Sequence, residues 1–420
     1  MKKLISILAL IVIVLIFLGG NFITSRAVES QNNTTDPLGW WEVQSIDSVK
    51  YSRDVAREKA KDTSFDQTID KQVSAIVSTG ATHIAIGTPY DKEFIPFLTR
   101  WVITARKYNL KVWFRGNMSG WEGWFGYKKI SRDEHIKQIQ EFILGNGALF
   151  EEGDIFSACP ECENGGPGDP RSTGDVKGHR QFLIDEYKIT NDSFRKIGKN
   201  VRSNFVPMNG DVAYLVMDKQ TTRDLGGIVV IDHYVKNPSE LATDIEKIAE
   251  KSGGKVVLGE FGAPIPDLNG SLTEEQQAIW INEALTGLSE ISELSGVNYW
   301  VGFGGTTALW KSGYSEKPAV KVLRSFFKPE VISGRVNNEI GKPVGGAKVS
   351  LGIKTQISNK DGTFTIPYIS DKYTLKIEAS GYKTQEFEIG KNQDLEVVVK
   401  KENEDIIFRI WKFLYRLSKG

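Results

Sequence analysis

The chain has 420 residues, with 53 Lys and Arg against 53 Asp and Glu, 40% hydrophobic residues, four His and two Cys. This length predicts two or three folded units, and a net charge of zero disfavours nucleic-acid binding as the main activity because no long-range field attracts a polyanion. Two Cys make no disulfide framework, and with four scattered His they complete no zinc site unless carboxylates join. We therefore expect neither a metal nor a cofactor.

Residues 1–23 are typical of a membrane anchor or an export signal. Lys2 and Lys3 precede an almost unbroken run of Leu, Ile, Val and Phe at residues 4–18. Counted through Ile23, the apolar stretch reaches ~20 residues, about the length that a bilayer core requires. No clean cleavage triplet follows, so we favour an uncleaved anchor over a cleaved signal. The basic flank predicts the amino terminus inside and the bulk outside, at the cell surface or secreted.

Residues 24–37 are polar and predict a tether, and residues 38–328 predict a (β/α)8 barrel, an α/β fold. Short β-branched or aromatic runs alternate there with segments of helical period, as in a parallel sheet covered by helices. Eight strands close a barrel. An open doubly wound sheet is the alternative, but no Gly-rich phosphate-binding sequence follows the first strand. The predicted strands are 41–45, 83–87, 111–115, 154–158, 202–206, 227–232, 255–259 and 297–301.

Polar and aromatic residues gather where these strands end, which is where such barrels build their chemistry. Cleavage of a glycosidic bond needs one carboxylic acid to protonate the leaving oxygen and one carboxylate across the anomeric carbon. Glu161 and Glu260 follow strands four and seven, on opposite sides of an eight-strand ring. The other candidates are Arg115, Asn117 and Trp121 after strand three, Glu163 after strand four, Asn209 after strand five, His233 and Tyr234 after strand six, and Trp300 after strand eight.

Glu at the ends of strands four and seven, His233-Tyr234 on strand six, Trp300 on strand eight and the stretch Gly259-Glu260-Phe261-Gly262 resemble the clan A glycoside hydrolases. These are retaining enzymes that include cellulases and mannanases. The resemblance implies that Glu260 is the nucleophile, Glu161 the acid/base and Tyr234 the group that orients the nucleophile. It further implies that His233 contacts the sugar or the acid, Arg115 keeps the nucleophile ionised, and Trp300 is the platform of the reacting sugar. We expect Asn117, Trp121 and Asn209 to bind substrate.

The strand-four sequence departs from that family. The usual Asn-Glu pair is Pro160-Glu161 here, and a second carboxylate, Glu163, follows two residues later, so either Glu can be the acid/base. If both face the barrel mouth, their repulsion raises one pKa, which suits a proton donor. Cys159 and Cys162 flank Glu161, and outside the membrane we expect a local disulfide there, with free thiols as the alternative.

The last ninety residues change character. Short alternating strands separated by turn residues predict a small all-β sandwich over residues 329–401. The steps at 333–336, 345–349, 361–364 and 379–382 resemble carboxypeptidase-regulatory-like (transthyretin-like) domains, which implies a spacer or adhesion module. Residues 402–420 predict a basic amphipathic helix that lies on an anionic membrane, or that docks against the sandwich or a partner.

These features together predict a membrane-tethered retaining glycoside hydrolase. It would cleave β-glycosidic bonds of an oligo- or polysaccharide by double displacement with two carboxylates. The alternative is a non-catalytic carbohydrate-binding or surface-attachment protein on a degenerate barrel, and the altered strand-four sequence keeps that alternative open.

Overall fold

The computed structural model describes residues 39–369, 374–388 and 394–402. The predicted anchor, the tether and the tail from residue 403 lie outside these ranges. Within them, no helix has the length and apolar character needed to cross a membrane.

Eight parallel strands form one sheet in the order β4-β3-β2-β1-β8-β7-β6-β5. The edge strands are joined by a parallel bridge between Ile155 and Arg202, and by the Glu161 backbone N, which donates to the Pro207 carbonyl at 2.8 Å. The predicted parallel barrel is therefore confirmed. The strands are β1 (Val43–Asp47), β2 (His83–Ile86), β3 (Lys111–Phe114), β4 (Ile155–Phe156), β5 (Pro207–Asn209), β6 (Ile228–Asp232), β7 (Lys255–Phe261) and β8 (Leu294–Tyr299).

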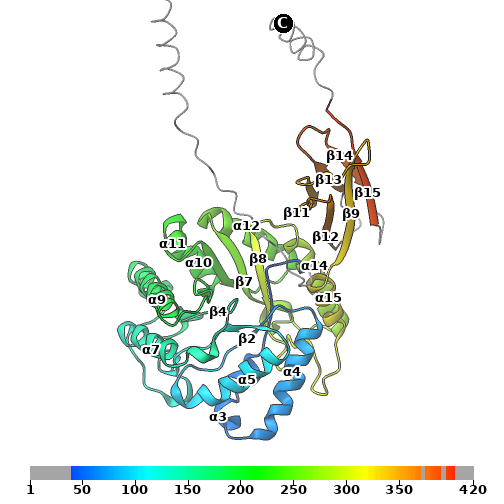
Figure 1. The fold of residues 1–420 in the computed structure, drawn as a ribbon. Helices are drawn as coiled ribbons and strands as arrows, with labels where there is room; N and C mark the ends of the chain where they lie inside the picture. Colours follow the sequence, from blue (N-terminus) through cyan, green and yellow to red (C-terminus); the bar gives the residue numbers. More distant parts are fainter. Residues whose placement is uncertain (1–38, 370–373, 389–393, 403–420) are drawn as a thin grey trace, which may run out of the picture. The chain divides into compact units, whose positions relative to one another are not determined.

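Helices surround the sheet (Figure 1). Local capping fixes where several of them begin: the Ser131 side chain accepts from the Glu134 backbone N, and Thr273 with Gln276 forms a capping box. The longer helices are α4 (Asp66–Ser78), α5 (Ile95–Lys107), α7 (Arg132–Gly145), α9 (Val176–Lys196), α10 (Gly210–Val216), α11 (Lys219–Asp224), α12 (Pro238–Ser252), α14 (Glu274–Leu288) and α15 (Pro318–Phe327). Short helices lie in the loops, namely α2 (Val49–Ser52), α3 (Ala56–Lys59), α6 (Ser119–Glu122), α8 (Pro170–Thr173) and α13 (Pro266–Asn269).

A compact cluster of buried side chains takes one residue from each of seven successive strand segments, as expected for a filled barrel interior. Trp113 and Phe205 meet edge to face in it, with ring centroids 5.3 Å apart. The cluster comprises Val43, Ala85, Trp113, Ile155, Phe205, Val230 and Val257. The interior of the barrel is thus filled with side chains, so a site open to a ligand can lie only at its ends.

The predicted fifth strand, 202–206, is wrong in its bounds. Arg202 forms a parallel bridge with Ile155 of β4, whereas the pairing of this segment with β6 begins only at Pro207. The segment changes its pairing partner between these positions. A hydrophobic run in the sequence indicates which side chains are buried, as Phe205 is, but it does not show which residues form the hydrogen bonds of the sheet.

Residues after α15 form two further sheets, of order β11-β10-β13-β14 and β12-β9-β15. Val336, Val349 and Ile366 lie in their shared apolar core. The strands predicted here from sequence are 331–336, 347–351, 363–366, 373–379 and 395–400. This prediction missed β11 and β14, because both are short edge strands with largely exposed side chains. The strands are β9 (Glu330–Asn338), β10 (Lys348–Leu351), β11 (Lys354–Ile357), β12 (Thr363–Tyr368), β13 (Thr374–Glu378), β14 (Gln385–Glu388) and β15 (Asp394–Val399).

Candidate active site

Arg115 lies at the centre of a group of carboxylates at the carboxyl ends of the barrel strands. Its Nη2 donates to Glu260 Oε1 at 2.8 Å and to Asp232 Oδ2 at 2.9 Å, and its Nε lies 3.6 Å from Asp47 Oδ2. Its Nη1 donates to the Gly259 carbonyl at 2.9 Å. The guanidinium is buried, so these contacts are shielded from water and fix it in one position.

Glu260, near the end of β7, is held from both oxygens. Tyr234 Oη donates to Oε2 at 2.7 Å, while Arg115 binds Oε1. The Tyr234 ring meets Trp300 edge to face, with centroids 5.9 Å apart. The Glu260 side chain keeps 15% of its surface exposed. Four residues predicted from separate strands therefore form one partly exposed group around a single carboxylate.

Asp47 and Asp232 belong to this group and were missed by the sequence analysis. Each is the last residue of its strand, β1 and β6, and each is buried. Burial raises the pKa of Asp47 to about 6 and raises the pKa of Asp232 well above its ordinary value, although the charge of Arg115 opposes both shifts. An acidic residue in the final position of a barrel strand was the signal that could have identified them.

Glu161 follows β4 in the left-handed region, with φ 48°. Burial raises the pKa of its carboxyl to about 8, and the nearby negative charge of Glu260 adds to the rise. Glu161 therefore holds a proton at neutral pH and sits close enough to Glu260 for the two charges to interact.

Glu163, the alternative acid/base, differs from Glu161 in that its carboxylate is bound by Asn209. Its Oε1 accepts from the Asn209 backbone N at 2.6 Å and from Asn209 Nδ2 at 2.9 Å, and the side chain is only 2% exposed. Its Oε2 has no hydrogen-bond partner among the described residues. Asn209, predicted to bind substrate, thus anchors Glu163 at the end of β5. This geometry favours Glu161 as the proton donor.

The expected disulfide between Cys159 and Cys162 is present, and it encloses Glu161. Trp121 supports the same loop through a hydrogen bond: its Nε1 donates to the Cys162 carbonyl at 3.1 Å. A Cβ on Gly166 would come within 2.3 Å of the Trp121 ring, so the loop can lie this close only with Gly there. The Glu161 loop is therefore braced by a covalent bond and by an aromatic side chain.

The predicted substrate contacts of Trp121 and Asn117 need correction. Trp121 is 1% exposed and stacks on Phe182, and Asn117 is fully buried. Asn117 Oδ1 accepts from His135 Nε2 at 2.7 Å, while its Nδ2 donates to Glu122 Oε1 at 2.6 Å. Both side chains therefore pack inside the protein: Trp121, a residue of α6, lies against Phe182, and Asn117 binds His135.

Glu122 is a further acidic group that the sequence analysis passed over. Burial raises the pKa of its carboxyl to about 7, and the charge of Glu163 contributes to the rise. Its charge in turn contributes to the raised pKa of Glu161. Glu122 follows directly on Trp121 in the loop after β3, a place where acidic residues in a barrel warrant attention.

His233 is held by a contact with α12, and its predicted contact with the sugar or the acid stays a prediction. Its Nε2 lies 3.0 Å from Asp244 Oδ2 on α12, and its Nδ1 lies 2.5 Å from where a Cβ on Gly210 would be. The ring is thus held between the start of α10 and α12. Nothing in the sequence pattern of strand six distinguishes this orientation from one toward the barrel axis.

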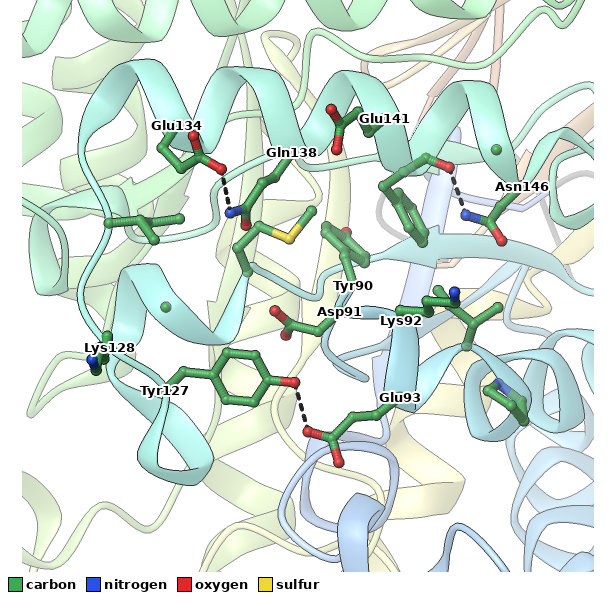
Figure 2. A pocket seen from close by; sticks show the side chains of 17 residues that line it. Tyr90, Asp91, Lys92, Glu93, Tyr127, Lys128, Glu134, Gln138, Glu141 and Asn146 are labelled. Atoms are coloured by element: carbon green, nitrogen blue, oxygen red, sulfur yellow. Dashed lines mark hydrogen bonds between the residues drawn. The ribbon is translucent and has the colours of Figure 1, made fainter.

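A separate pocket of about 790 Å³ lies on the flank of the barrel, between α5 and α7. Figure 2 shows Tyr127 and Glu93 across its lower edge, where Tyr127 Oη donates to Glu93 Oε1 at 2.6 Å. The carboxylates around Arg115 are not among its lining residues. Within the described part of the chain, no group of three or more His, Cys, Asp or Glu could hold a metal ion.

A family model matches the smaller domain, and solved structures resemble the barrel. Residues 331–401 match the family model of the carboxypeptidase regulatory-like domain, which confirms that resemblance. No curated protein sequence matches the chain.

Two similar solved structures are family 5, subfamily 18 glycoside hydrolases. One, from Streptomyces cattleya in complex with GlcNAc, has 12% identity and a TM-score of 0.52, covering 72% of this chain and 85% of its own. The other, from Bifidobacterium longum subsp. longum in complex with Manβ1-4GlcNAc, has 12% identity and a TM-score of 0.51, covering 73% of this chain and 86% of its own. At this identity the similarity concerns the fold alone, an eight-strand parallel barrel.

Proposed function

We propose that this chain, a barrel with the fold of the clan A glycoside hydrolases followed by a carboxypeptidase regulatory-like domain, is a retaining β-glycosidase. One observation carries the proposal. Glu260 is held by Arg115 and Tyr234 through its two oxygens, while Glu161, within range of its charge, keeps its proton at neutral pH. Two carboxyl groups in opposite protonation states are what double displacement requires.

In the first step, a Glu260 oxygen attacks the anomeric carbon as the glycosidic bond breaks. Glu161 gives its proton to the leaving oxygen, and a covalent glycosyl-enzyme ester forms. In the second step, Glu161 takes a proton from a water molecule whose oxygen attacks the same carbon. The ester bond breaks and Glu260 regains its charge. The Tyr234 hydroxyl and the Arg115 guanidinium hold and orient the carboxylate between turnovers.

The same contacts account for the change of role of Glu161. Part of the rise in its pKa comes from the negative charge of Glu260. That charge disappears when Glu260 becomes an ester, so the pKa of Glu161 falls in the intermediate. The acid of the first step thereby becomes the base that the second step needs.

The substrate in this proposal is a β-linked oligo- or polysaccharide. The two similar structures carry Manβ1-4GlcNAc and GlcNAc, so β-mannosides and β-N-acetylglucosaminides belong first in a substrate panel. We further propose an extracytoplasmic, membrane-tethered location, supported by the basic flank and apolar run of residues 1–23. Membrane fractionation of cells expressing the chain with and without residues 1–23 tests the location.

The enzymatic proposal is tested with a panel of aryl β-glycosides and a 2-deoxy-2-fluoro glycoside that traps the intermediate. We expect wild type to release the aryl group and to gain the mass of one sugar, located on Glu260 by peptide mass spectrometry. Glu260→Gln should lose both, whereas Glu250→Gln, an exposed Glu on α12, should keep both. Retention of glycans on the wild type without release of any aryl group or reducing sugar would instead support a binding protein.

A further inference from the structure

A small pocket of about 240 Å³ lies outside the group around Arg115, between the segment that follows β8 and helices α2 and α4. Its lining includes Tyr51, Gln72, Phe303, Trp310, Tyr314 and Lys317. Since one water molecule takes up about 30 Å³ in the liquid, the pocket has room for a single monosaccharide unit and not for a long chain. The proposed mechanism uses none of these side chains.

Gln72 is the first sign that the pocket takes a ligand. It lies on α4, is 1% exposed, and neither its Oε1 nor its Nε2 has a hydrogen-bond partner among the described residues. Buried amides are nearly always hydrogen-bonded, because an unpaired amide loses its interactions with water and gains nothing in return. Gln72 lines the pocket, so a polar group bound there can supply the missing partner.

The aromatic lining suits a sugar ring. Phe303 and Trp310 stack with centroids 4.8 Å apart and an interplanar angle of 10°, and Tyr314 is tilted against Phe303 at 5.6 Å. Aromatic rings combine apolar surface with a polar edge, and the C–H groups of a pyranose pack well on such surfaces.

The charges around the pocket are positive. Lys317 is half-buried and has no ion pair among the residues described. The Lys71 Nζ lies 5.2 Å from the centroid of the Tyr314 ring. The neighbouring acids are already paired: Glu274 binds Lys311 at 3.0 Å, and Glu316 binds Arg324 at 2.5 Å. Of the two lysines that line the pocket, Lys311 is paired with Glu274, so Lys317 is the one left to bind an anionic group.

The pocket also lies close to Trp300, the platform of the proposed reaction. The Lys50 Nζ is 5.4 Å from the centroid of the Trp300 ring, and a Cβ on Gly304 would lie 3.1 Å from the Cβ of Lys50. Gly304 and Tyr51, the residue after Lys50, both line the pocket. The Lys50 side chain thus runs from Gly304 in the pocket lining toward the Trp300 ring.

We propose that this pocket binds an acidic monosaccharide unit, one that carries a carboxylate or a sulfate ester, in a glycan whose reacting sugar lies on Trp300. Gln72 hydrogen-bonds the ring substituents, Lys317 pairs with the anion, and the aromatic rings pack on the pyranose. The inference deepens the proposed function by naming an acidic glycan as the substrate class. It rests on that function for turnover, but binding can be measured without it.

Calorimetric titration of the full chain with methyl β-D-glucuronide, methyl β-D-glucoside and glucose 6-sulfate tests the proposal. We expect the two anionic sugars to bind at least about tenfold more tightly than the glucoside, and their ratio to identify the preferred anion. Gln72→Leu and Lys317→Met should each weaken binding of the anionic sugars about fivefold or more. Lys188→Met, which removes an exposed lysine on α9, should change nothing.

Gln72→Leu also separates loss of a contact from loss of the fold. Replacing an unpartnered buried amide by an apolar group of similar size should leave the melting temperature unchanged or raise it. Equal affinity for the neutral and anionic sugars, or unchanged glucuronide binding in both pocket variants, would overturn the proposal. Glu260→Gln should bind normally. Anionic-sugar binding by the wild type without turnover of any glycoside would refute only the enzymatic function. Turnover of neutral glycosides, together with equal affinity for neutral and anionic sugars, would refute only the proposal that the pocket binds an acidic sugar.

Discussion

The side chain of Arg115 determines the electrostatics of the candidate site. One buried guanidinium contacts Asp47, Asp232 and Glu260, so it cannot neutralise every carboxylate at the barrel mouth. Glu260 receives direct hydrogen bonds from Arg115 and Tyr234, while Glu161 lies within range of the charges without such a bond to either. Burial, with the charge of Glu260, raises the pKa of Glu161, which suits Glu161 to hold the proton.

The pKa of Glu161 predicts the alkaline limit of catalysis. Since that pKa is raised to about 8 by burial and by the charge of Glu260, kcat/KM should fall about tenfold per pH unit above pH 8, as the acid loses its proton. Glu161→Ala should remove this limb and lower the rate about 100-fold or more for a phenyl glycoside. The loss should be much smaller for a dinitrophenyl glycoside, whose leaving group needs no proton. Rate profiles from pH 5 to 10 measure this, and loss of the limb in Glu163→Gln instead would assign the acid to Glu163.

Glu122 predicts a pH-dependent stability. Burial raises the pKa of its carboxyl from 4.5 to about 7, so the folded state binds the proton more tightly than the unfolded state. The free energy of unfolding should fall as the pH rises through this window. Glu122→Gln keeps the Asn117 contact without the charge, and its stability relative to wild type should be greater at pH 8 than at pH 5 by about 2 kcal/mol. Urea unfolding at both pH values measures the difference, and an equal difference at both would show that the charge is not penalised.

At the scale of elements, the segment from Cys159 to Gly166 positions Glu161, the proposed acid. Glu161 adopts a left-handed backbone conformation, which costs roughly 1–2 kcal/mol for a residue with a Cβ. The disulfide between the flanking residues Cys159 and Cys162 and the hydrogen bond from Trp121 to the loop hold that conformation. Backbone strain of this kind persists only where the surrounding structure over-determines it.

Removing the disulfide should therefore affect catalysis more than folding. In the double variant Cys159→Ala/Cys162→Ala, we expect kcat to fall about tenfold, because a displacement of the acid by a fraction of an ångström weakens proton transfer. KM should change little. The loop closed by the disulfide is short, so the free energy of unfolding should fall by less than about 3 kcal/mol. Steady-state kinetics with thermal melting tests this, and an unchanged kcat would show that the loop needs no covalent brace.

At the scale of the whole molecule, the barrel and the carboxypeptidase regulatory-like domain have distinct apolar cores. Ile366 belongs to the core of the smaller domain, together with Val336 and Val349. The residues of the candidate site all lie in the barrel. Catalysis and the stability of the smaller domain are therefore expected to respond to different substitutions.

Ile366→Ala should destabilise the smaller domain by about 2–5 kcal/mol, because the fully buried side chain leaves a cavity. Calorimetry should show a lowered transition for this domain, with a smaller shift for the barrel. The kcat/KM for aryl glycosides should stay within a factor of about two. A parallel loss of activity would mean that the smaller domain contributes to the site.

The sequence by itself determined the eight-strand barrel, the smaller β domain and the positions of Glu161 and Glu260 at strand ends. These features depend on periodicity and turn chemistry within about ten residues of chain. The tertiary structure alone decided that Arg115 meets Asp232 and Glu260, which lie 117 and 145 positions away, that Trp121 is buried, and that His233 faces α12. Contacts at such separations arise from barrel closure and side-chain packing, and no local pattern records them.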